Sequence, residues 1–175
     1  MIDVNLAPGN DKQPDGQWTL IIDRLPNPQQ AQGVFAINMA TNQIAPQLVL
    51  EVAVGNESMP QLTITDLNRY FGPGTGTRCW IGLKIFKTTN GNHRWWAGSA
   101  YRARAPNGTF LDAPDMSPES MPIVASHNTP ITTPKNIIFH VDVATLIDPC
   151  QPPPNYPATL NIDLEEIRRV IVHWI

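Results

Sequence analysis

Residues 46–87 read PQLVLEVAVGNESMPQLTITDLNRYFGPGTGTRCWIGLKIFK, and they predict a strand, a helix and a second strand in succession. The first part, residues 47–54, is nearly continuous in apolar residues, which is typical of a strand covered on both faces. Side-chain alternation puts Glu51 on one face of this strand together with Val49 and Ala53. Because burying a lone carboxylate is costly, we expect Glu51 to have partners or water.

The segment after this strand has the signals of a short helix. Ser58 can cap its start, Pro60 suits a first turn, and Gln61 stands three residues after the serine, as in a capping box. The run Gly72-Pro73-Gly74 ends it. We therefore predict a helix over residues 60–71, with one apolar face formed by Leu62, Leu67, Tyr70 and Phe71.

Two β-type runs follow, at residues 79–87 and 93–104. The Asn90-Gly91 step between them is a strong hairpin signal, so we predict an antiparallel pair. Trp95 and Trp96 must point to opposite faces, and we expect one of them to lie in the core.

The rest of the chain gives weaker signals. We predict strands at residues 18–22 and 136–147, a loop-like segment at 106–134 with a short strand at 123–124, and a helix at 163–174 that Asp163 caps. The stretch 34–37 fits either a strand or an insertion. The fold class expected from these elements is mixed α/β, rich in strands and in long proline-containing loops.

Composition limits the classes of function. The 175 residues suit a single domain over 1–175, and 42% of them are hydrophobic, enough for a packed core. A net charge of -3 excludes a strongly basic nucleic-acid clamp. Cys79 and Cys150 are too few for a disulfide scaffold, and no secretory signal or membrane-length apolar run occurs. We expect an intracellular protein, cytoplasmic or nuclear, that does not enter a membrane.

The candidate chemistry rests on carboxylates beside strands. The four histidines lack metal-ligand spacing, and no nucleophile elbow or phosphate-binding loop occurs. Asp15 lies in a turn before a strand and Glu51 lies within another. Two carboxylates on adjacent strands can hold Mg²⁺ or Mn²⁺, and a nearby lysine can orient the attacking water. Two carboxylates and a lysine of this kind are the groups that metal-dependent hydrolysis of a phosphodiester uses.

Four short motifs in order add a resemblance. They are Lys12-Gln13-Pro14-Asp15-Gly16, then residues 46–54, then Asn56-Glu57-Ser58 with its following residues, then Asp66 to Phe71. This series resembles uncharacterised fungal proteins that look like restriction-endonuclease-type domains of the PD-(D/E)XK nuclease superfamily. The match covers about residues 12 to 87.

The resemblance implies a central mixed sheet flanked by helices, with Asp15 and Glu51 as metal-binding acids and nucleic acid as substrate. The superfamily pattern places a lysine two residues after the strand glutamate, but Ala53 stands there. Lys84 is the replacement candidate, because alternation turns it away from Ile81, Leu83 and Ile85. The N-terminus is also shorter than the pattern, which indicates a trimmed or degenerate relative, and Asp23 is an alternative first acid.

Nucleic acid would be bound by arginines, chiefly Arg78, Arg94 and Arg102, of which the last two lie on or beside the tryptophan-bearing hairpin. Arg69 and Arg104 belong to the same set. The alternative interpretation of the hairpin, favoured by the net charge of -3, is a solvated outer face. A homodimer is an alternative to a monomer.

Two other classes of function stay open. One is a non-catalytic interaction module that keeps the sheet and has lost the lysine. The other is a β-sandwich-like binding domain, in which case the motif resemblance is a coincidence. Helix content separates them, because a sandwich predicts almost no helix, whereas the nuclease-like fold predicts the helices at residues 60–71 and 163–174.

Overall fold

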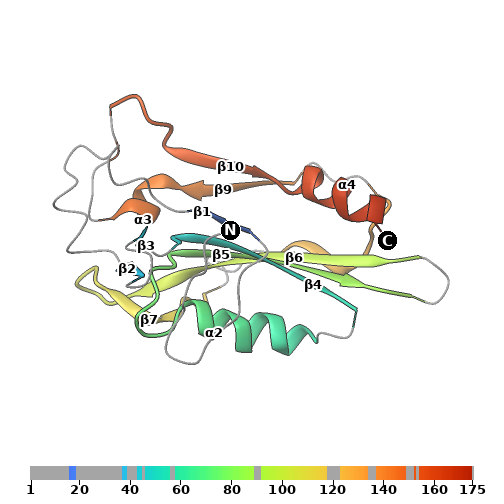
Figure 1. The fold of residues 1–175 in the computed structure, drawn as a ribbon, viewed down its shortest axis with the longest axis horizontal. Helices are drawn as coiled ribbons and strands as arrows, with labels where there is room; N and C mark the ends of the chain where they lie inside the picture. The colour runs from blue at the N-terminus through green and yellow to red at the C-terminus, as the bar shows by residue number, and fades with distance from the viewer. Residues whose placement is uncertain are drawn as a thin grey trace.

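The computed structural model of the chain describes residues 16–18, 37–38, 43–44, 46–55, 58–88, 92–117, 123–133, 137–148, 152 and 154–174. They form a mixed α+β structure in three layers (Figure 1). A central sheet lies between a helical segment on one side and a pair of strands with a helix on the other. The expected α/β class is thereby confirmed at the level of a mixed sheet with flanking helices. Among the helices that the structure describes, none is long and apolar enough to cross a membrane.

The central sheet has six strands in the order β1-β4-β5-β6-β7, with β8 also paired to β6. They are β1 (Gly16–Trp18), β4 (Leu48–Val54), β5 (Cys79–Phe86), β6 (Arg94–Arg104), β7 (Phe110–Pro114) and β8 (Ile123–Pro130). The pair β4 and β5 is parallel, and the other pairs are antiparallel. A parallel pair needs a crossover connection, and the helical segment after β4 supplies it.

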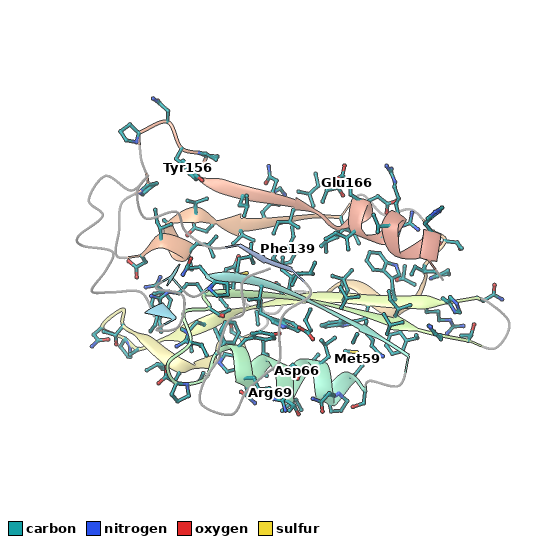
Figure 2. The ribbon with its side chains drawn as sticks, in the orientation of Figure 1. Met59, Asp66, Arg69, Phe139, Tyr156 and Glu166 are labelled. Atoms are coloured by element: carbon teal, nitrogen blue, oxygen red, sulfur yellow. The ribbon has the colours of Figure 1, made fainter. Side chains whose placement is uncertain are left out.

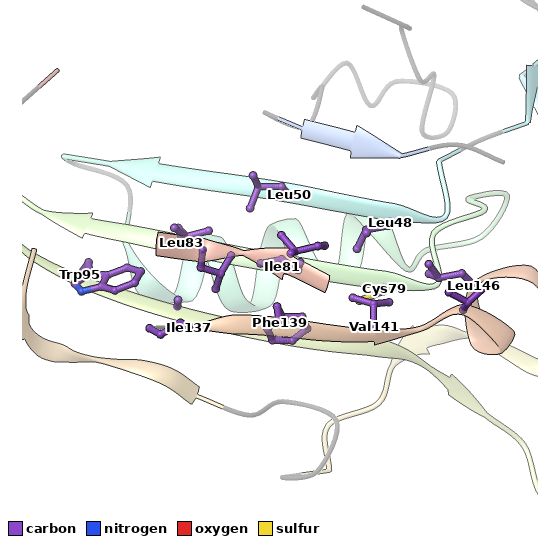
Figure 3. Packing of buried hydrophobic residues seen from close by; sticks show 14 of the residues in the cluster. Leu48, Leu50, Cys79, Ile81, Leu83, Trp95, Ile137, Phe139, Val141 and Leu146 are labelled. Atoms are coloured by element: carbon purple, nitrogen blue, oxygen red, sulfur yellow. The ribbon is translucent and has the colours of Figure 1, made fainter. Parts of the chain in front are cut away.

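The predicted alternation of β4 is confirmed, because its two faces belong to two different hydrophobic clusters. Leu48 and Leu50 pack into a cluster with Ile81, Leu83 and strand β9 (Figure 3). Val49 and Ala53 pack into the other cluster, under the helix. Both faces of the strand are covered, as its nearly continuous apolar run predicted.

The helical segment begins where the sequence predicts. The backbone N–H of Gln61 donates to the Ser58 hydroxyl at 3.2 Å, so Ser58 caps the start. The Gln61 side chain donates to Asp66 rather than completing a capping box. A π-helical stretch, η2 (Gln61–Asp66), runs into α2 (Leu67–Tyr70). Beyond it Gly74 takes a φ of 75°, a left-handed conformation that favours glycine.

A Trp-x-Gly pattern occurs twice on the helix-covered face of the sheet. Gly82 and Gly98 are cross-strand partners, and the side chains of Trp80 and Trp96 lie over them. A Cβ at Gly82 would come within 2.1 Å of the Trp80 ring, so the close approach requires glycine. Trp95 is buried on the other face. Both Trp95 and Trp96 therefore lie in the core, where the sequence predicted one.

The opposite layer consists of β9 (Ile138–Asp142) and β10 (Thr159–Asp163), which pair antiparallel, with α3 (Val143–Ile147) and α4 (Leu164–Trp174). Phe139 of β9 lies between this layer and the sheet (Figure 2). The prediction of one strand over residues 136–147 is wrong in its second half. Asp142 caps a helix there, since its carboxylate accepts from the Thr145 N–H at 2.8 Å.

The predicted C-terminal helix is confirmed. Asp163 accepts from the N–H groups of Glu165 and Glu166 at 2.8 and 3.4 Å, so it caps α4. Behind this cap, Glu165 and Arg168 form a buried ion pair. Helices at both predicted places exclude the β-sandwich interpretation, which required almost none.

One prediction for the connecting segments needs correction, and one open alternative is partly described. The segment at residues 106–134 contains the strands β7 and β8 rather than one short strand, because the outer edge of the long strand β6 pairs with both. The residues at 34–37 contribute Ile37 to a small pair, β2 (Ile37–Asn38) with β3 (Gln43–Ile44). Most of the strand predicted at 18–22 lies outside the described residues.

Candidate active site

Glu51 lies in the middle of β4 on the face that the helix covers. Its side chain is 3% exposed, and the hydroxyl of Tyr70 donates to its Oε2 at 2.7 Å. Tyr70 is the last residue of α2, so the helix that crosses from β4 to β5 brings this hydroxyl back over the strand. The need for a partner inferred from the sequence is confirmed, because a buried carboxylate requires hydrogen bonds.

Lys84 lies on β5 and faces the same layer. Its side chain is 2% exposed, and its Nζ donates to the carbonyl oxygen of Gly55 at 3.0 Å. Ile81, Leu83 and Ile85 point to the opposite cluster, so the predicted alternation is confirmed. Lys84 therefore shares the helix-covered face with Glu51.

The register of β4 and β5 relates these two residues closely. Gly82 is the partner of Glu51, and Lys84 is the partner of Ala53. The PD-(D/E)XK pattern places its lysine two residues after the strand glutamate, which is position 53. Lys84 therefore lies directly beside position 53, on the adjacent strand.

Asp15, the other predicted metal ligand, lies outside the described residues, as does the alternative Asp23. Its neighbour Gly16 is described and pairs with Leu50, the residue before Glu51. Within the described part of the chain, no group of three or more His, Cys, Asp or Glu side chains could hold a metal ion. The carboxylate pair predicted from the sequence therefore includes one residue outside the described part of the chain.

The three predicted nucleic-acid-binding arginines fall into two places. Arg78 and Arg102 line one pocket, near the start of β5. Arg94 is exposed at the far end of β6, where it pairs with Phe86. The structure therefore brings together two of the three.

Arg102 is largely engaged with the protein. Its guanidinium donates to the carbonyl oxygens of Gly72, Thr75, Thr77 and Leu111 and to the Asp112 carboxylate. Burial lowers the pKa of Arg102, and the hydrogen bond with Asp112 opposes this shift. These contacts tie the turn after α2 to strands β6 and β7, so this side chain has a structural role besides any ligand.

The free cysteine within the described residues is Cys79, which is fully buried. Burial raises the pKa of its thiol far above neutral pH. Because a thiolate is the reactive form, Cys79 is a core residue rather than a nucleophile. Cys150 lies outside the described residues.

Sequence reasoning missed Tyr70 as a polar partner, because it counted that residue only toward the apolar face of the helix. A tyrosine on the inner face of a helix that follows a strand glutamate is a usable signal, since a buried hydroxyl seeks a partner. Reasoning from sequence also missed Phe110, which packs against two arginines of the pocket.

The fold and this site define a mixed α+β domain with a carboxylate and a lysine on one helix-covered sheet face. No protein-family model, curated protein or solved structure matches the chain.

Proposed function

We propose that the protein is a divalent-metal-dependent nuclease whose active site lies on the helix-covered face of the sheet. Asp15 and Glu51 are the metal ligands, and Lys84 orients the attacking water. The observation that carries the proposal is the register of β4 and β5, in which Lys84 stands beside Ala53 on the face of Glu51. From position 84, a lysine amine can orient the attacking water as a lysine at position 53 would.

The pairing of β1 with β4 supports the role of Asp15. Gly16 and Leu50 are partners, Asp15 precedes Gly16, and Glu51 follows Leu50. The sequence neighbours of the two carboxylates are therefore direct cross-strand partners in the sheet.

The residue types fit Mg²⁺ or Mn²⁺, because both ions prefer hard oxygen ligands. When bound, such an ion polarises a phosphoryl oxygen and lowers the pKa of a bound water. Glu51 is held in place by the Tyr70 hydroxyl at 2.7 Å, and this bond fixes one carboxylate oxygen. Lys84, on the adjacent strand, supplies the N–H donor for the water.

A second candidate function is a non-catalytic interaction module with the same sheet. Two observations favour it: Ala53 occupies the lysine position of the pattern, and Glu51 is buried with Tyr70 as a partner. In that case Glu51 and Lys84 stabilise the fold, and the protein cleaves nothing.

Cleavage of supercoiled plasmid and of single-stranded DNA separates the two candidates. With Mg²⁺ or Mn²⁺ present, we expect wild type to cleave and Glu51→Gln to lose at least about 100-fold in rate, because metal catalysis depends on ligand charge. The glutamine can still accept the Tyr70 hydrogen bond, so the fold should be kept. Glu166→Gln, on the exposed side of α4 (Figure 2), is the matched control and should cleave as wild type does. An inactive wild type, or full activity in Glu51→Gln, would contradict the nuclease proposal.

A further inference from the structure

Three arginines gather in one pocket away from Glu51. The pocket has a volume of about 680 Å³, and Arg78, Arg102, Arg104, Phe110 and Asp148 contribute to its lining. Its size lies within the range of small-molecule sites, about 300–1,000 Å³. The residues come from the start of β5, from β6 and β7, and from the end of α3. The sheet therefore assembles this site from distant parts of the chain.

Phe110 organises two of the cations. The guanidinium carbon of Arg78 lies over its ring at 3.6 Å from the centroid, and that of Arg104 at 3.9 Å. Both guanidinium groups therefore lie within stacking distance of this one ring. Stacking on the ring holds each guanidinium in a defined orientation. Nη1 of Arg104 also donates to the carbonyl oxygen of Gly108 at 3.1 Å.

The charge of this arginine pocket is opposite to that of the chain as a whole. Two carboxylates face its three cations: Arg102 pairs with Asp112 at 2.9 Å, and Arg104 pairs with Asp148 at 2.8 Å. Burial, followed by the charges of Arg102 and Arg104, lowers the pKa of Arg78 to about 10, while Asp148 opposes the shift. Arg78 is still a cation at neutral pH, and an entering anion would relieve the repulsion among the arginines.

The ion pair between Arg104 and Asp148 is replaceable. The two side chains are 36% and 38% exposed, and ion pairs exposed to this extent are screened by water and contribute little to stability. The ion pair with Asp148 therefore holds Arg104 only weakly. A ligand that carries more charge than one carboxylate can take its place.

We propose that the arginine pocket binds a phosphomonoester, either the terminal phosphate of a nucleic-acid strand or that of a free nucleotide. A phosphomonoester carries a charge of about −1.5 to −2 at pH 7 and three acceptor oxygens, which suit guanidinium forks better than one carboxylate does. A terminal phosphate can enter a concave site end-on, whereas a phosphodiester continues on both sides and needs a groove. This inference requires no cleavage at Glu51.

Calorimetric titration tests the pocket with three probes: a short 5′-phosphorylated single strand, the same strand with a 5′-hydroxyl, and deoxyadenosine 5′-monophosphate. We expect wild type to bind the phosphorylated strand at least about 10-fold more tightly than the hydroxyl strand. The hydroxyl strand lacks the terminal phosphate, so it cannot accept the charge-assisted hydrogen bonds of the arginines. Nucleotide affinity equal to that of the phosphorylated strand would assign recognition to the phosphate ester alone. Weaker nucleotide binding would assign it to the strand end.

Substitutions in the arginine pocket test whether the phosphorylated strand binds there. Arg104→Gln should weaken binding of the phosphorylated strand by about 10-fold or more, because it removes one charged donor. Asp148→Asn should tighten binding, because it removes the competing carboxylate. Lys87→Gln, an exposed lysine beyond the opposite end of β5, is the control and should bind as wild type does. Equal affinities for the two strands, or unchanged affinity in both Arg104→Gln and Asp148→Asn with thermal unfolding like that of wild type, would overturn the proposal.

Discussion

Lys84→Met should lower the rate of DNA cleavage by about 100-fold to 10,000-fold, the range that a residue acting on the proton of a nucleophile contributes. The proposal gives Lys84 the task of orienting the attacking water, and its amine is the part that methionine lacks. Methionine retains an unbranched apolar side chain, so it can fill the space of the buried lysine stem beside Phe86.

The measurement compares the single-turnover cleavage rates of wild type, Lys84→Met and Lys87→Met at saturating Mn²⁺. Lys87 is an exposed residue directly after the same strand, so its variant should cleave at the wild-type rate. Near-UV circular dichroism shows whether each variant is folded. A folded Lys84→Met that cleaves like wild type would remove Lys84 from the active site.

Glu165→Ala should lower the free energy of unfolding by about 3–5 kcal/mol, the cost of leaving one member of a buried ion pair alone. Glu165 and Arg168 are 3% and 6% exposed, and two hydrogen bonds of 2.7 and 2.5 Å join them. Arg168 also donates to the carbonyl oxygen of Ile131, which ties α4 to the end of β8. Without Glu165, the positive charge of Arg168 stays buried without this carboxylate.

Urea unfolding measures this effect, with Glu166→Ala as the control because Glu166 is the exposed neighbour on the same helix. The control should change the free energy of unfolding by less than about 0.5 kcal/mol. Replacing both partners, as in Glu165→Leu with Arg168→Met, should recover most of the loss, since well-packed apolar pairs can substitute for buried ion pairs. If Glu165→Ala unfolds at the wild-type urea concentration, the buried pair does not stabilise α4.

Local patterns predicted the centre of the fold. The apolar run of β4, the serine cap of the following helix and the Asn-Gly step of the hairpin each depend on residues close in sequence. For the same reason the cap at Asp163 was predictable. The α3 helix was missed because a short run rich in β-branched residues looks like a strand, although Val143, Leu146 and Ile147 have helical spacing.

Strand β7 was missed, and only the first two residues of β8 were predicted, because the segment at residues 106–134 that contains both strands is rich in polar residues and proline. They pair with β6 only because that strand is long enough to offer its edge to both. Such pairing is a property of the assembled sheet, and propensity alone does not indicate it.

Part of the candidate site was predictable as well. Alternation along two strands was enough to place Glu51 and Lys84 on faces that the parallel pairing then brought together. The arginine pocket was not predictable, because Arg78, Phe110 and Asp148 meet only through the register of β5, β6 and β7 and the position of α3. The sequence identifies the arginines but does not indicate which of them share a pocket.

Mn²⁺ binding, measured by calorimetry on wild type, Glu51→Gln and Asp15→Asn, tests the central claim most directly. The control is again Glu166→Gln. The account predicts that wild type and the control bind Mn²⁺ alike, and that each of the two site variants loses at least about 10-fold in affinity, because each removes one ligand charge. Mn²⁺ affinity that is absent from folded wild type, or unchanged in Glu51→Gln, would contradict a metal site on this face of the sheet.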